Sequence, residues 1–154
     1  MDVPGLHQAS EIAHERRRSL QHVVLSVEPA VARRQLEMAL TAQAWGGDIG
    51  DVLLAVSEAL VNAAQHAGGA RRAEAWLSES SVVVRVCDRG PSFDPAPYVE
   101  RPPDVLAERG RGVWLMSRVA DACEAHVEPD GGSVVLRFDR DEHRTRRDRV
   151  FSPS

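Results

Sequence analysis

The chain contains 154 residues, of which 43% are hydrophobic and 27% are charged, and its formal net charge at pH 7 is -4. This composition is typical of one globular domain with tails, and the acidic balance argues against a dedicated nucleic-acid-binding protein, which would usually carry a basic stripe. The two cysteines, Cys87 and Cys123, do not lie in a CxxC pair, which argues against a zinc finger or a disulfide scaffold.

Residues 1–19 are predicted to form a polar N-terminal extension. They contain no apolar segment of the kind found in secretory signals. No apolar stretch in the chain approaches the roughly 20 residues that a membrane span needs, and two free thiols suit a reducing compartment. We therefore expect a cytoplasmic protein that makes no contact with a membrane.

A strand and a helix are predicted to follow the extension. The short, β-branched run His22–Val27 favours a strand. Pro29 then suits the first turn of a helix. We expect this helix to end at Gly46 and Gly47.

A second helix is predicted over Ile49–Ala67. Asp48 or Asp51 can cap it, because a carboxylate accepts the free amide hydrogens at a helix start. Two alternating segments come next, Ala73–Ser78 and Val82–Cys87, and they favour an antiparallel pair of strands.

The segment Asp88–Arg109 is long, irregular and rich in proline, which is typical of a functional lid. A third helix is predicted over Gly112–Asp121. The chain is then expected to form a hairpin from Glu124–Glu128 and Ser133–Phe138, because Asp130-Gly131 suits its turn.

The second helix carries the first motif with chemical potential. Glu58, Asn62 and His66 are spaced i, i+4 and i+8, so they share one helix face. The amide oxygen of Asn62 is a suitable hard ligand for Mg²⁺, and Glu58 could deprotonate a nucleophile near the same metal. His66 lies at the helix end near the predicted pocket. The alternative is a solvated polar stripe without function.

The second motif follows the second strand of the antiparallel pair. Asp88 is expected to project from the strand end, where its carboxylate can accept a hydrogen bond from an exocyclic amine such as adenine N6. Gly90 would let the backbone pass close to a flat base. The alternative is an ordinary turn after a strand.

The third motif places Gly110 and Gly112 just before the third helix. Free amides at a helix start form an anion site, and Arg111 or Arg109 can add positive charge. The motif is not a P-loop, because no GxxxxGK[ST] occurs.

Together, the order and spacing of these motifs resemble the superfamily that joins gyrase, the histidine-kinase catalytic domain and the bacterial anti-sigma-factor serine kinases (GHKL, Bergerat fold). Its N box resembles Glu58–His66, its G1 box resembles Asp88–Gly90 and its G2 box resembles Gly110–Gly112. The sequence is most similar to the anti-sigma serine-kinase group. The resemblance covers roughly residues 20–138 and leaves 139–154 as a flexible tail.

The resemblance implies an α+β fold, a two-layer sandwich in which helices cover one face of a mixed, mostly antiparallel sheet. ATP would lie between the helices and the lid. Asn62 would bind Mg²⁺, and Gly110, Gly112 and the Arg111 region would meet the phosphates. Glu58 would be the general base that activates the serine hydroxyl of a partner.

The same resemblance implies an adenine pocket formed by Asp88 and Gly90, with the hydroxyl of Ser133 beside the aspartate. Two positions depart from the family pattern. Arg89 replaces a small residue of the G1 box, and Val113 stands where leucine is common. The prolines of the lid could also alter its closure.

The resemblance therefore implies an anti-sigma factor that binds a sigma factor and phosphorylates a small antagonist protein on serine or threonine. It also implies that the protein can form a homodimer. One alternative is a non-catalytic ATP-sensing interaction module. Another is a histidine-kinase fragment, because the segment at His14 resembles a phosphoacceptor helix, although a two-helix dimerisation hairpin does not fit before the first strand.

Overall fold

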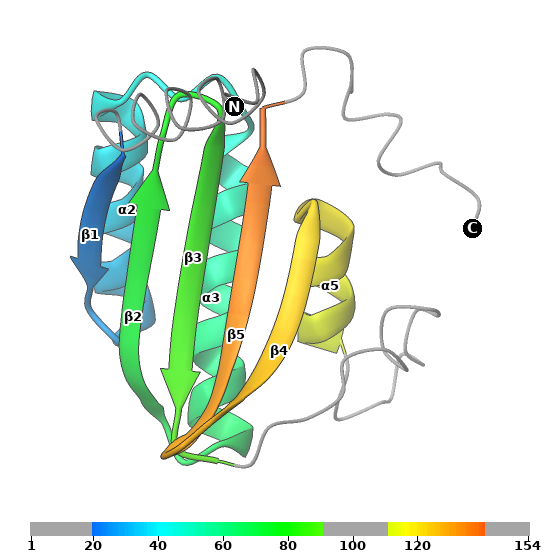
Figure 1. The fold of residues 1–154 in the computed structure, drawn as a ribbon. Helices are drawn as coiled ribbons and strands as arrows, with labels where there is room; N and C mark the ends of the chain where they lie inside the picture. The colour runs from blue at the N-terminus through cyan, green and yellow to red at the C-terminus, as the bar shows by residue number, and fades with distance from the viewer. Residues whose placement is uncertain (1–19, 91–110, 141–154) are drawn as a thin grey trace, which may run out of the picture.

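A computed structural model describes residues 20–90 and 111–140 of the chain (Figure 1). The predicted extension, residues 141–154 of the predicted tail and residues 91–109 of the predicted lid lie outside this described part. The predicted start of the tail at residue 139 is wrong, because Asp139 is the last residue of a strand. No helix within residues 20–90 and 111–140 has both the length and the apolar character needed to cross a membrane.

The first described helix is α2 (Pro29–Ala42). Glu28 caps it, and the carboxylate oxygens of Glu28 accept hydrogen bonds from the amides of Ala30 at 3.2 Å and Val31 at 2.9 Å. The predicted end at the glycine pair is wrong. The helix ends four residues earlier because Ala44 adopts a left-handed φ of 50°.

The central helix is α3 (Ile49–His66), which matches the predicted helix except for one residue at its end. Of the two candidate caps, Asp48 is the one used, since its Oδ1 accepts from the amide of Asp51 at 3.1 Å. The apolar face of α3 is buried in the core and consists of Val52, Leu53, Ala55, Val56, Ala59, Leu60 and Ala63.

The five strands found in the described residues form one sheet in the order β1-β2-β3-β5-β4, and all neighbouring strands are antiparallel. Their bounds are β1 (Gln21–Leu25), β2 (Ala70–Leu77), β3 (Ser81–Asp88), β4 (Ala122–Glu128) and β5 (Gly131–Asp139). The predicted strands are therefore present, although several are longer than expected. The mixed sheet implied by the resemblance is fully antiparallel in the described residues.

A crossover through α5 (Arg111–Val119) connects β3 to β4. β5 then returns between these two strands. Because β5 is antiparallel to both neighbours, β3 and β4 run in the same direction without touching. This order brings the start of β5 beside the end of β3, where Asp88 pairs with Gly132.

The helices α2, α3 and α5 lie together on one face of the sheet, as Figure 1 shows, and the predicted two-layer α/β sandwich is confirmed. Alternate residues of the central strands point into this layer, including Val84, Val86 and Leu136, which are at most 2% exposed. The core therefore lies between the sheet and the helices.

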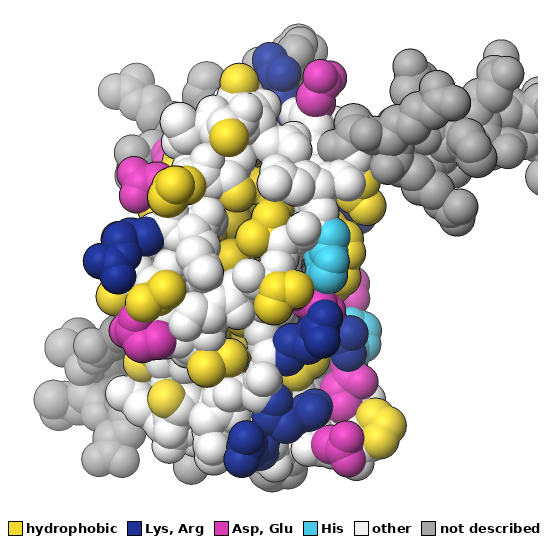
Figure 2. All heavy atoms as spheres, turned by 90° about the vertical axis from the view of Figure 1, so that its left-hand side faces the viewer, with side chains coloured by type: hydrophobic (Ala, Val, Ile, Leu, Met, Phe, Trp, Pro, Cys, Tyr) yellow, Lys and Arg dark blue, Asp and Glu magenta, His cyan; other side chains and the backbone are white. Residues whose placement is uncertain are grey.

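The other face, here called the open face, is not covered by any described helix and carries charged side chains. The Glu74 carboxylate of β2 lies on this face, with the side chain only 7% exposed. It accepts from Arg72 Nε at 2.8 Å, lies 3.2 Å from His22 Nε2, and lies 3.8 Å from Arg85 Nη1. Seen from the β1 side, most of the visible basic side chains lie toward the lower end of the view (Figure 2).

This arrangement predicts that the protein loses stability in acid. Burial alone would raise the pKa of Glu74, but hydrogen bonds from Arg72 and His22 together with their charges hold that pKa below the ordinary value of 4.5. A lowered folded-state pKa stabilises the protein above the unfolded-state value, and this stabilisation is lost as pH falls through the folded-state value. We therefore expect the free energy of unfolding to fall as pH drops below about 4.5.

Urea unfolding of the wild-type protein and of Glu74→Gln, at several pH values between 7 and 3, isolates this contribution. The variant cannot titrate at position 74, so the difference in unfolding free energy between the two proteins should shrink as pH falls. A difference that stays constant over this range would contradict the prediction.

Candidate functional site

The start of α5 lies against the polar stripe of α3. A Cβ placed on Gly112 would lie 2.8 Å from Glu58 Oε2, 3.0 Å from Asn62 Nδ2 and 3.1 Å from Asn62 Oδ1. The first and third motifs, which are far apart in the sequence, therefore converge at one point. Because real Cβ atoms rarely approach other atoms this closely, glycine is the residue that leaves both polar side chains in place.

Packing holds the first turn of α5 at this point. Val113 is 5% exposed and Met116 is 1% exposed, so both anchor the helix to the core. The first amides of a helix lack intrahelical acceptors and carry the positive end of its dipole. The amides at the start of α5 therefore lie close to Glu58 and Asn62. Gly110 and the side chain of Arg111 lie outside the described residues.

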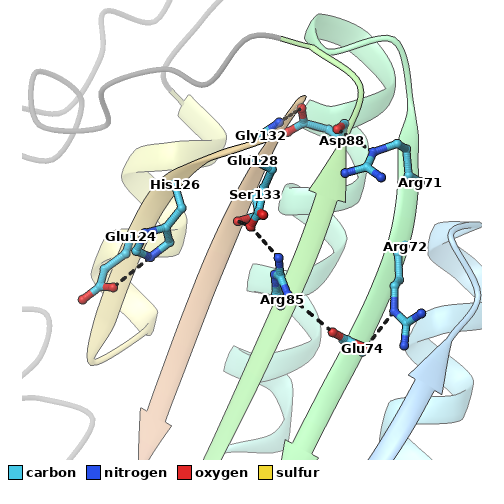
Figure 3. A network of polar contacts seen from close by, with 10 residues as sticks. All are labelled: Arg71, Arg72, Glu74, Arg85, Asp88, Glu124, His126, Glu128, Gly132 and Ser133. Carbon is cyan, nitrogen blue, oxygen red and sulfur yellow. Dashed lines mark hydrogen bonds and ion pairs between the residues drawn. The ribbon is translucent and has the colours of Figure 1, made fainter. Parts of the chain in front are cut away.

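Asp88, the last residue of β3, has a carboxylate that is held on one side. Its Oδ1 accepts from the backbone amides of Gly90 at 3.0 Å and Gly132 at 3.3 Å, and the residue is 7% exposed. Within the described part of the chain, no hydrogen bond to its Oδ2 is found. This second oxygen can therefore accept a hydrogen bond from a ligand. Figure 3 shows the Asp88 side chain beside Gly132.

Gly90 has a packing role that sequence reasoning did not anticipate. A Cβ on Gly90 would lie 2.6 Å from the Cα of Ala67, just beyond the end of α3. The Arg89 amide also donates to the carbonyl of Ala67 at 3.2 Å. The chain after β3 is thus tied to the same helix that carries Asn62, while His66, the last residue of α3, is exposed.

The structure does not bring Ser133 to Asp88. Ser133 pairs with Cys87 on the open face, and its Oγ donates to Glu128 Oε1 at 2.8 Å. The Asp88–Gly132 pair, one position away, faces the helices, so alternation along the strand turns Ser133 in the opposite direction. The predicted place of this hydroxyl beside Asp88 is therefore wrong. The amide of Gly132 takes that place, and no local sequence signal indicated it.

Neither cysteine has the character of a reactive nucleophile. Burial raises the pKa of Cys87, which is 5% exposed. Burial also raises the pKa of Cys123 to about 11. Because the thiolate is the reactive form of cysteine, both side chains are expected to be inert at neutral pH.

Comparison with known families decides the family membership. The sequence profile of the histidine kinase-like ATPase domain matches residues 14–138. The chain belongs to this family of ATPase domains. The resemblance inferred from the three motifs is therefore confirmed, and the described motif residues Glu58, Asn62, Asp88 and Gly112 all lie inside the matched region.

Two relatives of this ATPase domain carry the name serine-protein kinase RsbW. The relative from Bacillus licheniformis is 38% identical over 102 residues, which cover 57% of this chain and 62% of the relative. The relative from Bacillus thuringiensis is 33% identical over 121 residues, which cover 69% of this chain and 74% of the relative. The chain thus spans less than two thirds of the first relative and about three quarters of the second.

Proposed function

We propose that this ATPase domain binds ATP between α3, the start of α5 and the end of β3. The observation that carries the proposal is the convergence of Gly112 with Glu58 and Asn62. The amides at the start of α5 would receive the phosphates. The second oxygen of Asp88 would accept the exocyclic amine of adenine.

Magnesium is the metal that the donor set fits. Mg²⁺ prefers oxygen ligands and is usually held by one or two protein groups together with phosphate oxygens and water. Asn62 presents its amide oxygen beside Gly112, and Glu58 presents a carboxylate at the same point. We infer that Asn62 is the protein ligand. When bound, the ion would neutralise charge that develops on the phosphates.

The reaction that these residues suit is phosphoryl transfer to a protein hydroxyl. Glu58 is half-buried next to the proposed phosphate site, and a carboxylate in that place can act as a general base. It would accept the proton of a serine or threonine hydroxyl of the partner. The hydroxyl oxygen would then bond to the γ-phosphorus, and the bond to the β–γ bridging oxygen would break, which releases ADP.

The partner class rests on the resemblance to the anti-sigma serine-kinase group and on relatives named serine-protein kinases. We propose that the protein is an anti-sigma factor that phosphorylates an antagonist protein, with a sigma factor as its second partner. The alternative is a binding-only role, in which ATP sets the affinity for a partner through two conformational states.

The test has two steps. Calorimetric titration with ATP, in Mg²⁺ and then in excess chelator, should show binding that depends on the metal. Proteins captured from the native cell extract on the purified chain are then incubated with γ-labelled ATP, and acid-stable label on serine or threonine is expected. No binding at millimolar ATP would reject the ATP site. Binding without transfer would favour the sensing module, and acid-labile label on His14 would favour the histidine-kinase alternative.

A further inference from the structure

Arg71 occupies a β-bulge beside Asp88. In the ladder between β2 and β3, Ala70 pairs with Asp88 and Arg72 pairs with Cys87, so Arg71 is the extra residue without a partner in the ladder. An extra residue of this kind bends its strand and redirects a side chain, and such bulges are common next to active sites. The bulge therefore sits directly opposite the carboxylate proposed to contact adenine.

The bulge decides where the Arg71 side chain goes. Along regular β2, Ala73 and Ala75 face the helices and are fully buried, while Glu74 faces the open face. Strict alternation would place Arg71 on the side of Ala73, toward the helix layer. Instead Arg71 is exposed, and its Nε donates to the backbone carbonyl of Asp88 at 3.0 Å (Figure 3).

The peptide group between Asp88 and Arg89 is enclosed on several sides. A Cβ on Gly131 would lie 2.1 Å from the Asp88 carbonyl oxygen, so the β4–β5 turn packs directly on that oxygen. The Arg89 amide, which belongs to the same peptide group, donates a hydrogen bond to the carbonyl of Ala67. Arg71 adds the only side-chain hydrogen bond to this carbonyl that occurs in the described residues.

We propose that Arg71 is a positioning residue that holds the backbone of Asp88, so that the free carboxylate oxygen of Asp88 meets the exocyclic amine of adenine. This inference rests on the proposed function. A hydrogen bond to a base amine needs a donor–acceptor distance near 2.9 Å and good alignment. A small rotation of the Asp88 peptide would move the carboxylate off that geometry, and Arg71 opposes the rotation.

The test compares two nucleotides that differ at the atom Asp88 would read. Inosine triphosphate has a carbonyl oxygen where ATP has the exocyclic amine, so the ratio of its Kd to that of ATP measures this contact. We expect Arg71→Met, which keeps the aliphatic stem and removes the donor, to lower this ratio about three- to tenfold, the effect of about one hydrogen bond. Arg71→Lys restores a donor and should recover part of the ratio.

Arg72→Met is the matched control. Arg72 is the next arginine on the same strand and is also exposed, but its Nε binds Glu74 on the open face instead of Asp88. The Arg72→Met variant should leave the ratio of the two Kd values unchanged. Thermal unfolding of each variant measures any general loss of stability, and circular dichroism confirms that it is folded.

The outcomes separate this inference from the proposed function. A wild-type ratio in Arg71→Met, or an equal loss in Arg72→Met, would overturn the role of Arg71 while leaving the ATP site intact. If the wild-type protein binds the two nucleotides equally well, the assignment of Asp88 to adenine is rejected, and the proposed role of Arg71 is rejected with it.

Discussion

Replacing Glu58 by glutamine is expected to lower the rate of phosphoryl transfer by about 10²- to 10⁴-fold, the usual contribution of a general base. Glutamine has nearly the same size, so it should remain beside Gly112 without displacing Asn62. It cannot accept the hydroxyl proton, however. The affinity for ATP should change little, because the proposed nucleotide contacts lie on α5, Asn62 and Asp88. Single-turnover transfer from labelled ATP and calorimetric titration measure the two quantities separately.

Glu37→Gln provides the control for this prediction. Glu37 is exposed on α2, away from the convergence of α3 and α5, and undergoes the same chemical change. Its variant should transfer phosphate at the wild-type rate. Transfer that persists undiminished in Glu58→Gln would reject the base assignment. A parallel loss of ATP affinity would instead show that Glu58 acts in binding.

Replacing Asp88 by asparagine is expected to weaken ATP binding by about 10- to 100-fold. The new side chain can keep one oxygen toward the amides of Gly90 and Gly132, so the local fold is preserved. Its NH₂ group then faces the exocyclic amine of adenine, and two donors oppose each other. Losing a hydrogen bond to a charged group costs about 1.5–3 kcal/mol, which corresponds to this range of affinity.

Calorimetric titration with ATP and with inosine triphosphate checks the prediction for Asp88. The variant should lose affinity for ATP selectively, and its Kd for inosine triphosphate should rise much less. Asp139→Asn serves as the control, because Asp139 pairs with Ser81 at the opposite end of the sheet. Equal losses for both nucleotides would indicate a structural role for Asp88 in place of base recognition.

Local signals in the sequence predicted most of the helices and strands. They also placed the first motif on α3 and Asp88 at the end of β3. Pro29 and Asp48 marked helix starts that the structure confirms, and the alternation in Val82–Cys87 predicted β3. The polar stripe of α3 was also visible, because side chains spaced by four residues share a helix face. Caps, turns and periodicity act between near neighbours in the chain, so they can be recognised without knowledge of the fold. The third motif lies partly outside the described residues.

The contacts that complete the site depend on the tertiary arrangement. The insertion of β5 between β3 and β4 brings the Gly132 amide to Asp88 and turns Ser133 away. The bulge at Arg71 is a property of the pairing between β2 and β3, and no local pattern marked it. Strand order and register follow from burying the apolar faces of all elements at once. The sequence by itself therefore determined the elements and the motif residues, while packing decided which residues meet.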